Sequence, residues 1–225
     1  MLLVAHAAFV ACNDELRHTA QLASPAAATG SPVNVGTLIK LPQPKGEEAT
    51  FPAALDGSPY AFYFAPSTSN STQWTINING GGWCYDEMDC ACRAKDALGT
   101  STLASPTGGG NCKNPSEAGG LIQNCNSVDL LYLDGASFSG YRADPVPVPG
   151  SSAKLWMRGI KNLDATIDWL FANGGLGDAT EVLLSGESAG ELIFFFFTVL
   201  HFVRIPAAND VHLLILAPLN MINSK

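Results

Sequence analysis

The stretch Leu183-Leu184-Ser185-Gly186-Glu187-Ser188-Ala189-Gly190 carries a G-x-S-x-G pattern directly after an apolar run. This pattern is typical of a sharp turn between a strand and a helix, which lifts a serine hydroxyl clear of a sheet and needs small neighbours. We therefore predict a strand over 181–184, a helix from Ala189 to about Arg204, and Ser188 as a candidate nucleophile. Since serine is also a common first residue of helices, the alternative is that Ser188 only caps this helix.

A second glycine-rich stretch, Gly80-Gly81-Gly82, follows a segment (74–79) in which apolar and polar residues alternate as in a strand. Bare backbone N–H groups can bind the oxyanion that forms when a serine attacks an acyl group, together with the N–H of the residue after the nucleophile. Gly81, Gly82 and Ala189 are the candidate donors. The alternative for the glycines is a plain tight turn. Together, the two stretches predict ester hydrolysis.

Strand and helix patterns alternate along the rest of the chain. The apolar spacing over 160–172 predicts a further helix. Additional strands are predicted over 61–65, 128–133 and 211–216. Such alternation is typical of a mostly parallel α/β sheet with helices on both faces.

The N-terminal residues 1–12 resemble the apolar core of a secretion signal, although no Lys or Arg precedes them. We interpret residues 1–50 as a signal-like leader with an irregular lead-in and residues 51–225 as the N-terminal part of one domain, and we expect a secreted or cell-wall protein. No run reaches the roughly 18 to 20 apolar residues of a membrane span. A net charge of −8 without a basic run argues against a nucleic-acid partner.

Five cysteines lie in one loop-rich window: Cys84, Cys90, Cys92, Cys112 and Cys125. Their clustering predicts local disulfides made in an oxidising compartment. Because five is an odd number, we expect at least one of them to be free or to lack its partner. A zinc site is disfavoured, since no paired C-x-x-C occurs and no histidine lies nearby.

A serine nucleophile needs a histidine base and an acid that orients it. The histidines are His6, His18, His201 and His212. The first two lie in the leader, and His212 lies in an apolar strand. His201 would lie about 20 Å along the helix from Ser188, at about 1.5 Å per residue, which excludes it as a direct base. The sequence therefore shows a nucleophile without its base.

Five motifs in this order resemble the pectin acetylesterase family, which also contains the Notum-type carboxylesterases. They are Leu55-Asp56-Gly57-Ser58, Gly80-Gly81-Gly82-Trp83-Cys84, Asp134-Gly135-Ala136-Ser137-Phe138-Ser139-Gly140, Arg158-Gly159 and the stretch 183–190. The resemblance implies an α/β-hydrolase-like fold. Because the acid and the histidine of that family lie well downstream of its nucleophile, we interpret the chain as truncated at its C-terminus.

The same resemblance implies removal of O-acetyl groups from a pectin-type polysaccharide through an acyl-serine intermediate. Ser188 would be the nucleophile and Gly81, Gly82 and Ala189 the oxyanion donors. Cys84 and Cys90 would form the small disulfide loop of the family. No metal or organic cofactor is implied. The expected partner is the acetylated polysaccharide, and the oligomeric state is left open.

Four positions depart from the family pattern. Glu187 and Glu191 stand where the family usually has cysteine and glycine, and two carboxylates near the serine disfavour an oxyanion. Ala54 and Leu133 stand where it tends to have cysteines, as the loss of one shared disulfide would leave them. Two alternatives therefore stay open: a catalytically inactive carbohydrate-binding relative, and a Notum-type lipid deacylase with a different acyl pocket.

Overall fold

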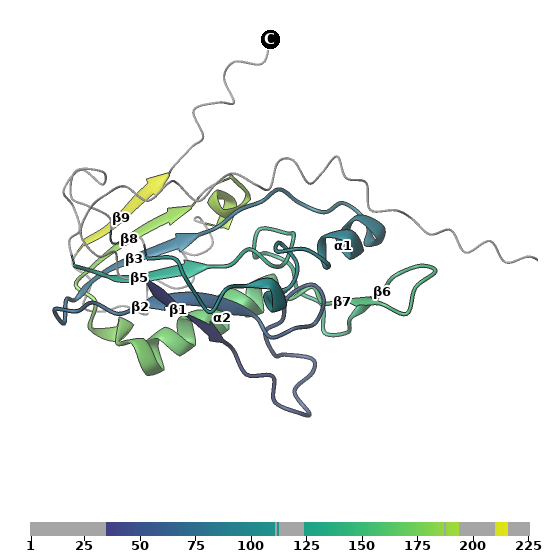
Figure 1. Ribbon diagram of the computed structural model, residues 1–225, viewed down its shortest axis with the longest axis horizontal. Helices are drawn as coiled ribbons and strands as arrows, with labels where there is room; N and C mark the ends of the chain where they lie inside the picture. Colours follow the sequence, from purple (N-terminus) through teal and green to yellow (C-terminus); the bar gives the residue numbers. More distant parts are fainter. Residues whose placement is uncertain (1–34, 111, 113–123, 187, 194–209, 216–225) are drawn as a thin grey trace, which may run out of the picture.

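A seven-stranded sheet forms the centre of the computed structural model, which describes residues 35–110, 112, 124–186, 188–193 and 210–215 (Figure 1). The strands lie in the order β4 (Thr107–Gly108), β1 (Gly36–Lys40), β2 (Ala61–Ala65), β5 (Asn126–Leu130), β3 (Gln73–Ile78), β8 (Glu181–Gly186) and β9 (Asp210–Ile215). A separate ribbon pairs β6 (Val146–Pro147) with β7 (Lys154–Leu155).

The strand direction changes across this sheet. Strands β5, β3, β8 and β9 are parallel to one another, whereas β4, β1 and β2 are antiparallel to their neighbours, and β2 is also antiparallel to β5. The prediction of a parallel α/β sheet is therefore confirmed for four strands only, and the described sheet as a whole is mixed. The connection from β1 to β2 contains no helix, and antiparallel neighbours need no helical crossover.

Strand β1 lies in the segment 1–50, for which an irregular lead-in is predicted. Its residues Thr37, Leu38 and Ile39 pair with β2, with Leu38 opposite Tyr63. These β-branched and apolar side chains suit a strand that has a partner on each side. The prediction of irregular structure is thus wrong for residues 36–40.

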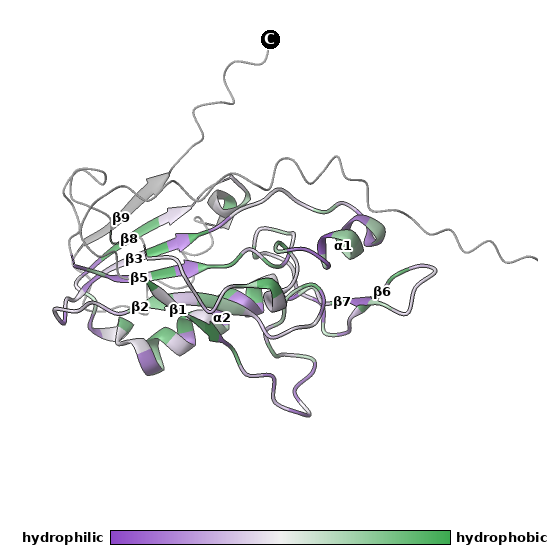
Figure 2. Ribbon diagram, in the orientation of Figure 1, coloured by the Kyte–Doolittle hydropathy of each residue, from purple (hydrophilic) through white to green (hydrophobic). Residues whose placement is uncertain are grey.

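The main core lies between the sheet and α2 (Gly159–Trp169). Alternate residues of β3 face α2, as the period of two in a strand requires. Leu163 and Ile167 of α2 are buried in this core together with Trp74, Ile76 and Ile78 of β3. Figure 2 shows the apolar centres of the strands and the mixed surface of α2. This buried face fixes β3 and β8 in place, and the candidate site lies where these two strands end.

The described part of the chain contains few α-helices. α2 confirms the helix predicted over 160–172, and a π-helical turn (Leu170–Gly174) extends it. The other one, α1 (Glu87–Arg93), packs beside the β6–β7 ribbon and not on the sheet. The helix predicted from Ala189 begins as a 3-10 segment (Ser188–Ile193), and its remainder lies outside the described residues. Of the described α-helices, only α2 therefore covers a face of the sheet.

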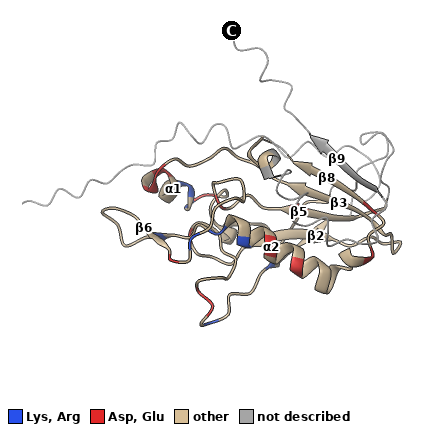
Figure 3. Ribbon diagram, turned by 180° about the vertical axis from the view of Figure 1, so that it is seen from behind, with Lys and Arg blue, Asp and Glu red and all other residues tan. Residues whose placement is uncertain are grey.

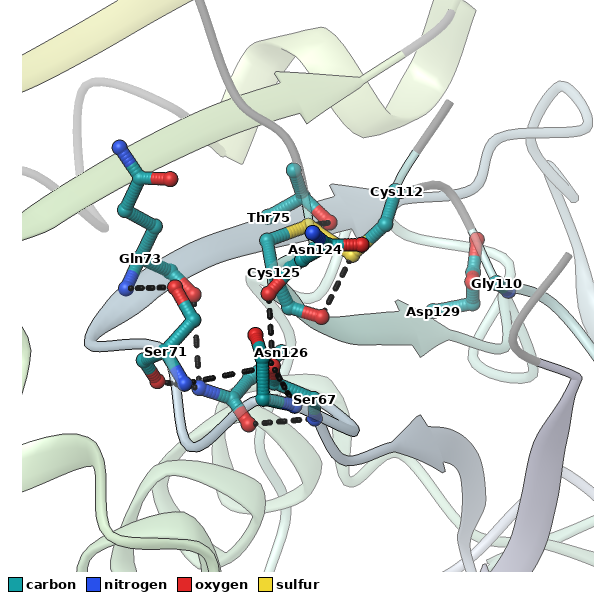
Figure 4. Close-up of a disulfide and its surroundings, with 11 residues drawn as sticks. Ser67, Ser71, Gln73, Thr75, Gly110, Cys112, Asn124, Cys125, Asn126 and Asp129 are labelled. Atoms are coloured by element: carbon teal, nitrogen blue, oxygen red, sulfur yellow. Dashed lines mark hydrogen bonds between the residues drawn. A yellow bond between two sulfur atoms is a disulfide. The ribbon is translucent and has the colours of Figure 1, made fainter. Parts of the chain in front are cut away.

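A disulfide stabilises the face of the sheet opposite α2 (Figure 4). Cys112 is bonded to Cys125, and the hydroxyl of Thr75 lies 3.5 Å from the Cys125 sulfur. Next to it, the side-chain amide of Asn126 donates to the Ser71 carbonyl oxygen at 2.7 Å. These contacts fix the start of β5 beside the start of β3.

Candidate active site

The two glycine-rich stretches lie side by side at one edge of the sheet. β3 and β8 are parallel neighbours with Ile78 opposite Gly186, so the loops after both strands leave the sheet at the same edge (Figure 1). Gly190 packs on the end of β3, because an added Cβ would overlap the carbonyl oxygen of Ile78 and lie 2.8 Å from that of Asn79. The structure therefore brings the serine turn and the triple glycine together.

Ser188 occupies a strained backbone conformation between β8 and the 3-10 segment. Its φ is 52°, a left-handed value that non-glycine residues rarely adopt. The residue is exposed, whereas Ala189 behind it is buried. A helix N-cap residue normally has an extended backbone, so this φ disfavours the capping alternative. It is the conformation expected of a serine on a sharp strand-to-helix turn.

The triple-glycine loop presents N–H groups that nothing in the described part of the chain accepts. Asn79 N–H donates to Leu130 and Cys84 N–H donates to Gly135, but none of the four N–H groups between them donates to a described residue. A Cβ on Gly81 would lie 2.9 Å from the end of the Leu98 side chain, which would have to move. Residues 80–83 are half-buried or exposed, so their N–H groups are open to a bound anion, as an oxyanion site requires.

Several hydrogen bonds join the glycine loop to Tyr132 and to the loop Asp134–Gly140 that follows it. The Tyr132 hydroxyl donates to the Gly82 carbonyl oxygen at 2.7 Å and accepts the Ser137 N–H at 3.0 Å. The Trp83 indole N–H donates to the Ser137 hydroxyl at 2.9 Å. Tyr132 is not among the residues predicted for the site; its hydroxyl-bearing side chain just after a buried apolar strand is the pattern that could have pointed to it.

A cavity of about 470 Å³ lies between these loops and the 3-10 segment after Ser188. It is lined by Trp83, Cys84, Gly135, Ala136, Ser137, Ser139 and Leu192. The predicted site residues Gly81, Gly82, Ser188 and Ala189 are not among these lining residues. Gly82 directly precedes the lining residue Trp83, and Ser188 and Ala189 belong to the same 3-10 segment as the lining residue Leu192.

A family model described as pectinacetylesterase matches residues 38–212, most of the chain. This chain belongs to the pectinacetylesterase family. The resemblance that the five motifs predict is thereby confirmed.

Curated members of the family align with the same region. Pectin acetylesterase 5 of Arabidopsis thaliana is 35% identical over 158 residues, which cover 68% of this chain and 35% of that protein. Pectin acetylesterase 11 of the same plant is 34% identical over 146 residues, which cover 61% of this chain and 35% of that protein. The chain thus spans about a third of the length of these relatives.

Notum proteins are more distant matches. A palmitoleoyl-protein carboxylesterase NOTUM of Schmidtea mediterranea is 29% identical over 140 residues, which cover 60% of this chain and 25% of that protein. The solved structure of the Wnt deacylase Notum from Drosophila superposes with a TM-score of 0.58 at 24% identity, covering 81% of this chain and 51% of that one. This superposition shows that the fold is the α/β-hydrolase fold of Notum.

The family motif at 134–140 begins with a buried carboxyl group, that of Asp134. Burial raises the pKa of Asp134 from 3.8 to about 7, although the Phe138 N–H, the backbone N–H groups nearby and the charge of Arg93 act in the opposite direction. Gly159 leaves the space for this group, because a Cβ there would overlap Asp134 Oδ2. Asp134 Oδ1 has no hydrogen-bond partner among the described residues. The motifs at 134–140 and 158–159 therefore meet at one carboxyl.

The disulfide that the family resemblance implies is confirmed, since Cys84 is bonded to Cys90. Cys92 is disulfide-bonded as well, and no cysteine in the described ranges is free. The expectation of a free or partnerless cysteine is therefore wrong. Ala54 and Leu133 both lie in the main core, and Leu55 N–H donates to the Leu133 carbonyl oxygen, so the two substituted positions are neighbours there.

The partners of a serine nucleophile lie outside what the structure describes. His6, His18, His201 and Glu187 are not among the described residues, and only the backbone is described for His212 and Glu191.

Within the described ranges, no three His, Cys, Asp or Glu side chains form a group that could hold a metal ion. The helices in those ranges are all too short or too polar to cross a bilayer. Figure 3 shows both Lys and Arg (blue) and Asp and Glu (red) on the described ribbon.

Proposed function

We propose that this chain carries the nucleophile and the oxyanion site of a serine carboxylesterase that removes O-acetyl groups from a pectin-type polysaccharide. The observation that carries the proposal is the position of Ser188, strained at φ 52°, beside a loop whose N–H groups have no described acceptor. Membership of the pectinacetylesterase family supports the substrate class.

In the first step, the Ser188 hydroxyl oxygen attacks the carbonyl carbon of the acetyl ester while its proton passes to a general base. The negative oxygen that results is bound by the N–H groups of Gly81, Gly82 and Ala189. Donors that are already in place stabilise this charge without reorganisation, and the loss of one costs about 3 kcal/mol of barrier lowering. The bond to the sugar oxygen then breaks, and that oxygen leaves with a proton as a hydroxyl.

In the second step, water attacks the acetyl-serine and releases acetate, which restores the serine hydroxyl. The base for both steps is a histidine that an acid orients. None of the described side chains is a histidine, so this role belongs to a group outside the described residues.

The disulfides support a role outside the cytosol. Cys84–Cys90 and Cys112–Cys125 form and persist in oxidising compartments, and the first of them borders the cavity. We infer that the protein is secreted or resides in the cell wall, where acetylated pectin occurs as a polymer.

The test uses a fluorophosphonate probe on the full-length protein that contains this chain and supplies the histidine and the acid, beside its Ser188→Ala variant. We expect labelling of the parent protein and none of the variant, together with acetate release from acetylated pectin. Equal labelling of both proteins would contradict the proposal. Absence of labelling from both, with retained binding to pectin, would favour the inactive carbohydrate-binding relative. Release of palmitoleate but not acetate would favour the lipid deacylase.

A further inference from the structure

The Tyr132 hydroxyl is bonded to both loops that border the cavity. It donates to the carbonyl oxygen of Gly82 at 2.7 Å and accepts the N–H of Ser137 at 3.0 Å. The ring below it is buried, at 2% exposure, and packs on Phe138 with a centroid separation of 5.7 Å. One rigid side chain therefore sets the spacing between the glycine loop and the loop that carries Ser137.

The first of these bonds orients the peptide between Gly82 and Trp83. None of the described peptide bonds is cis, and in a trans peptide the carbonyl and the following N–H point in opposite directions. Since the Gly82 carbonyl points to Tyr132, the Trp83 N–H points away from it. That N–H has no acceptor among the described residues. The hydroxyl thus fixes the orientation of the peptide that directly follows the proposed donor Gly82.

The second bond holds a strained part of the opposite loop. Ser137 and Phe138 have φ values of 53° and 55°, which cost energy in residues that carry a Cβ. Such a conformation persists only where neighbouring groups hold it. Here the Ser137 N–H is bound by Tyr132, its hydroxyl by the Trp83 indole, and the Phe138 N–H by Asp134.

The hydroxyl keeps its proton under ordinary conditions, as this arrangement requires. Burial, together with the nearby charge of Asp134, raises the pKa of Tyr132 to about 12, and the Ser137 contacts and Arg93 lower it only in part. Tyr132 therefore stays a hydrogen-bond donor to Gly82 at neutral pH.

We propose that Tyr132 is a positioning residue of this site, whose hydroxyl orients the Gly82–Trp83 peptide and ties the glycine loop to the loop at Ser137. This inference rests on the proposed esterase function and adds a residue that the family motifs do not assign. Tyr132 acts through the backbone of Gly82 and does not itself contact the reacting ester.

Tyr60 offers a matched control. It is also fully buried, it also packs against Phe138, and its hydroxyl also donates to one carbonyl oxygen, that of Leu131, at 2.9 Å. Tyr60→Phe therefore removes the same kind of hydrogen bond without touching the glycine loop. Both variants should lower the unfolding temperature, and Tyr132→Phe should lower it more, because it loses two hydrogen bonds of a buried hydroxyl and Tyr60→Phe loses one.

The experiment compares the parent protein with both variants by two readouts. We expect Tyr132→Phe to slow fluorophosphonate labelling of Ser188 by about tenfold or more and to speed amide hydrogen exchange in segments 79–86 and 135–139. Tyr60→Phe should leave both unchanged. Equal labelling rates and equal exchange in the two variants would overturn the inference. If the parent protein is not labelled, the proposed function fails, and the exchange comparison still decides whether Tyr132 holds the two loops.

Discussion

Gly190 lies so close to Asn79 that a Cβ on Gly190 would come within 2.8 Å of the Asn79 carbonyl oxygen. This contact joins the segment after the candidate nucleophile to the strand end that precedes the triple glycine. It explains why two stretches more than a hundred residues apart can act on one ester group. The packing also makes the site sensitive to a single added methyl group.

We expect Gly190→Ala to lower the free energy of unfolding by about 1–3 kcal/mol, because the new Cβ has no room beside backbone atoms. The displaced turn should also abolish Ser188 labelling. Gly177→Ala is the control, since its Cβ would lie 3.6 Å from the nearest atom, an ordinary contact. Urea unfolding and probe labelling of both variants measure this difference. Equal behaviour of the two would show that the contact at Asn79 does not constrain the turn.

Asp134 should make stability depend on pH. Its pKa in the folded chain, about 7, lies above the ordinary 3.8, so folding favours the protonated carboxyl. The stability that this provides is fully present below pH 3.8 and is lost as the pH rises to about 7. The difference amounts to roughly 4 kcal/mol.

Asp134→Asn should remove most of that pH dependence, because asparagine keeps the shape and can still accept the Phe138 N–H. The measurement is the free energy of unfolding in urea between about pH 4 and about pH 8. Asp144→Asn, at an exposed position, is the control and should keep the parental dependence. A parental pH dependence in Asp134→Asn would contradict the assignment of the buried acid.

The two described disulfides should differ in what their loss changes. Their sequence separations are 6 and 13 residues. In the chain-entropy model they stabilise the fold by roughly 2 and roughly 3 kcal/mol. We expect the serine double variant at Cys84 and Cys90 to slow probe labelling as well, because Cys84 lines the cavity.

The serine double variant at Cys112 and Cys125 is the comparison, since this pair lies at the start of β5 on the far side of the sheet from α2. It should lower the unfolding free energy without slowing the labelling of folded protein. Thermal unfolding and labelling rates report the two effects separately. Slower probe labelling of this variant would contradict the proposed position of the site. An unchanged labelling rate in the Cys84 and Cys90 variant would contradict it as well.

Local patterns predicted the parts of this fold that local physics decides. The apolar run before Gly186 and the alternation over 74–79 correspond to β8 and β3, and the spacing over 160–172 corresponds to α2. Strand β1 was missed because the five residues Gly36–Lys40 show no alternation, and only their partners in β2 and β4 make them a strand.

The candidate site likewise contains residues that local patterns predict and one that they do not. Ser188 and the three glycines stand out in sequence because turns and bare backbone demand particular residue types. The link through Tyr132 could not be predicted, because it depends on a tertiary contact of Tyr132 with Gly82, fifty residues away. The mixed direction of the sheet was missed for the same reason, since strand pairing is decided by distant segments.

The most direct test of the account is a crystal structure of the Ser188 adduct with a phosphonate. The phosphonyl oxygen stands in for the oxyanion of the ester reaction. We expect this oxygen to lie within roughly 3 Å of backbone N–H groups from both the glycine loop, at Gly81 and Gly82, and the serine turn, at Ala189. An adduct whose oxygen meets no N–H from the glycine loop would contradict the claim that these two segments form one oxyanion site.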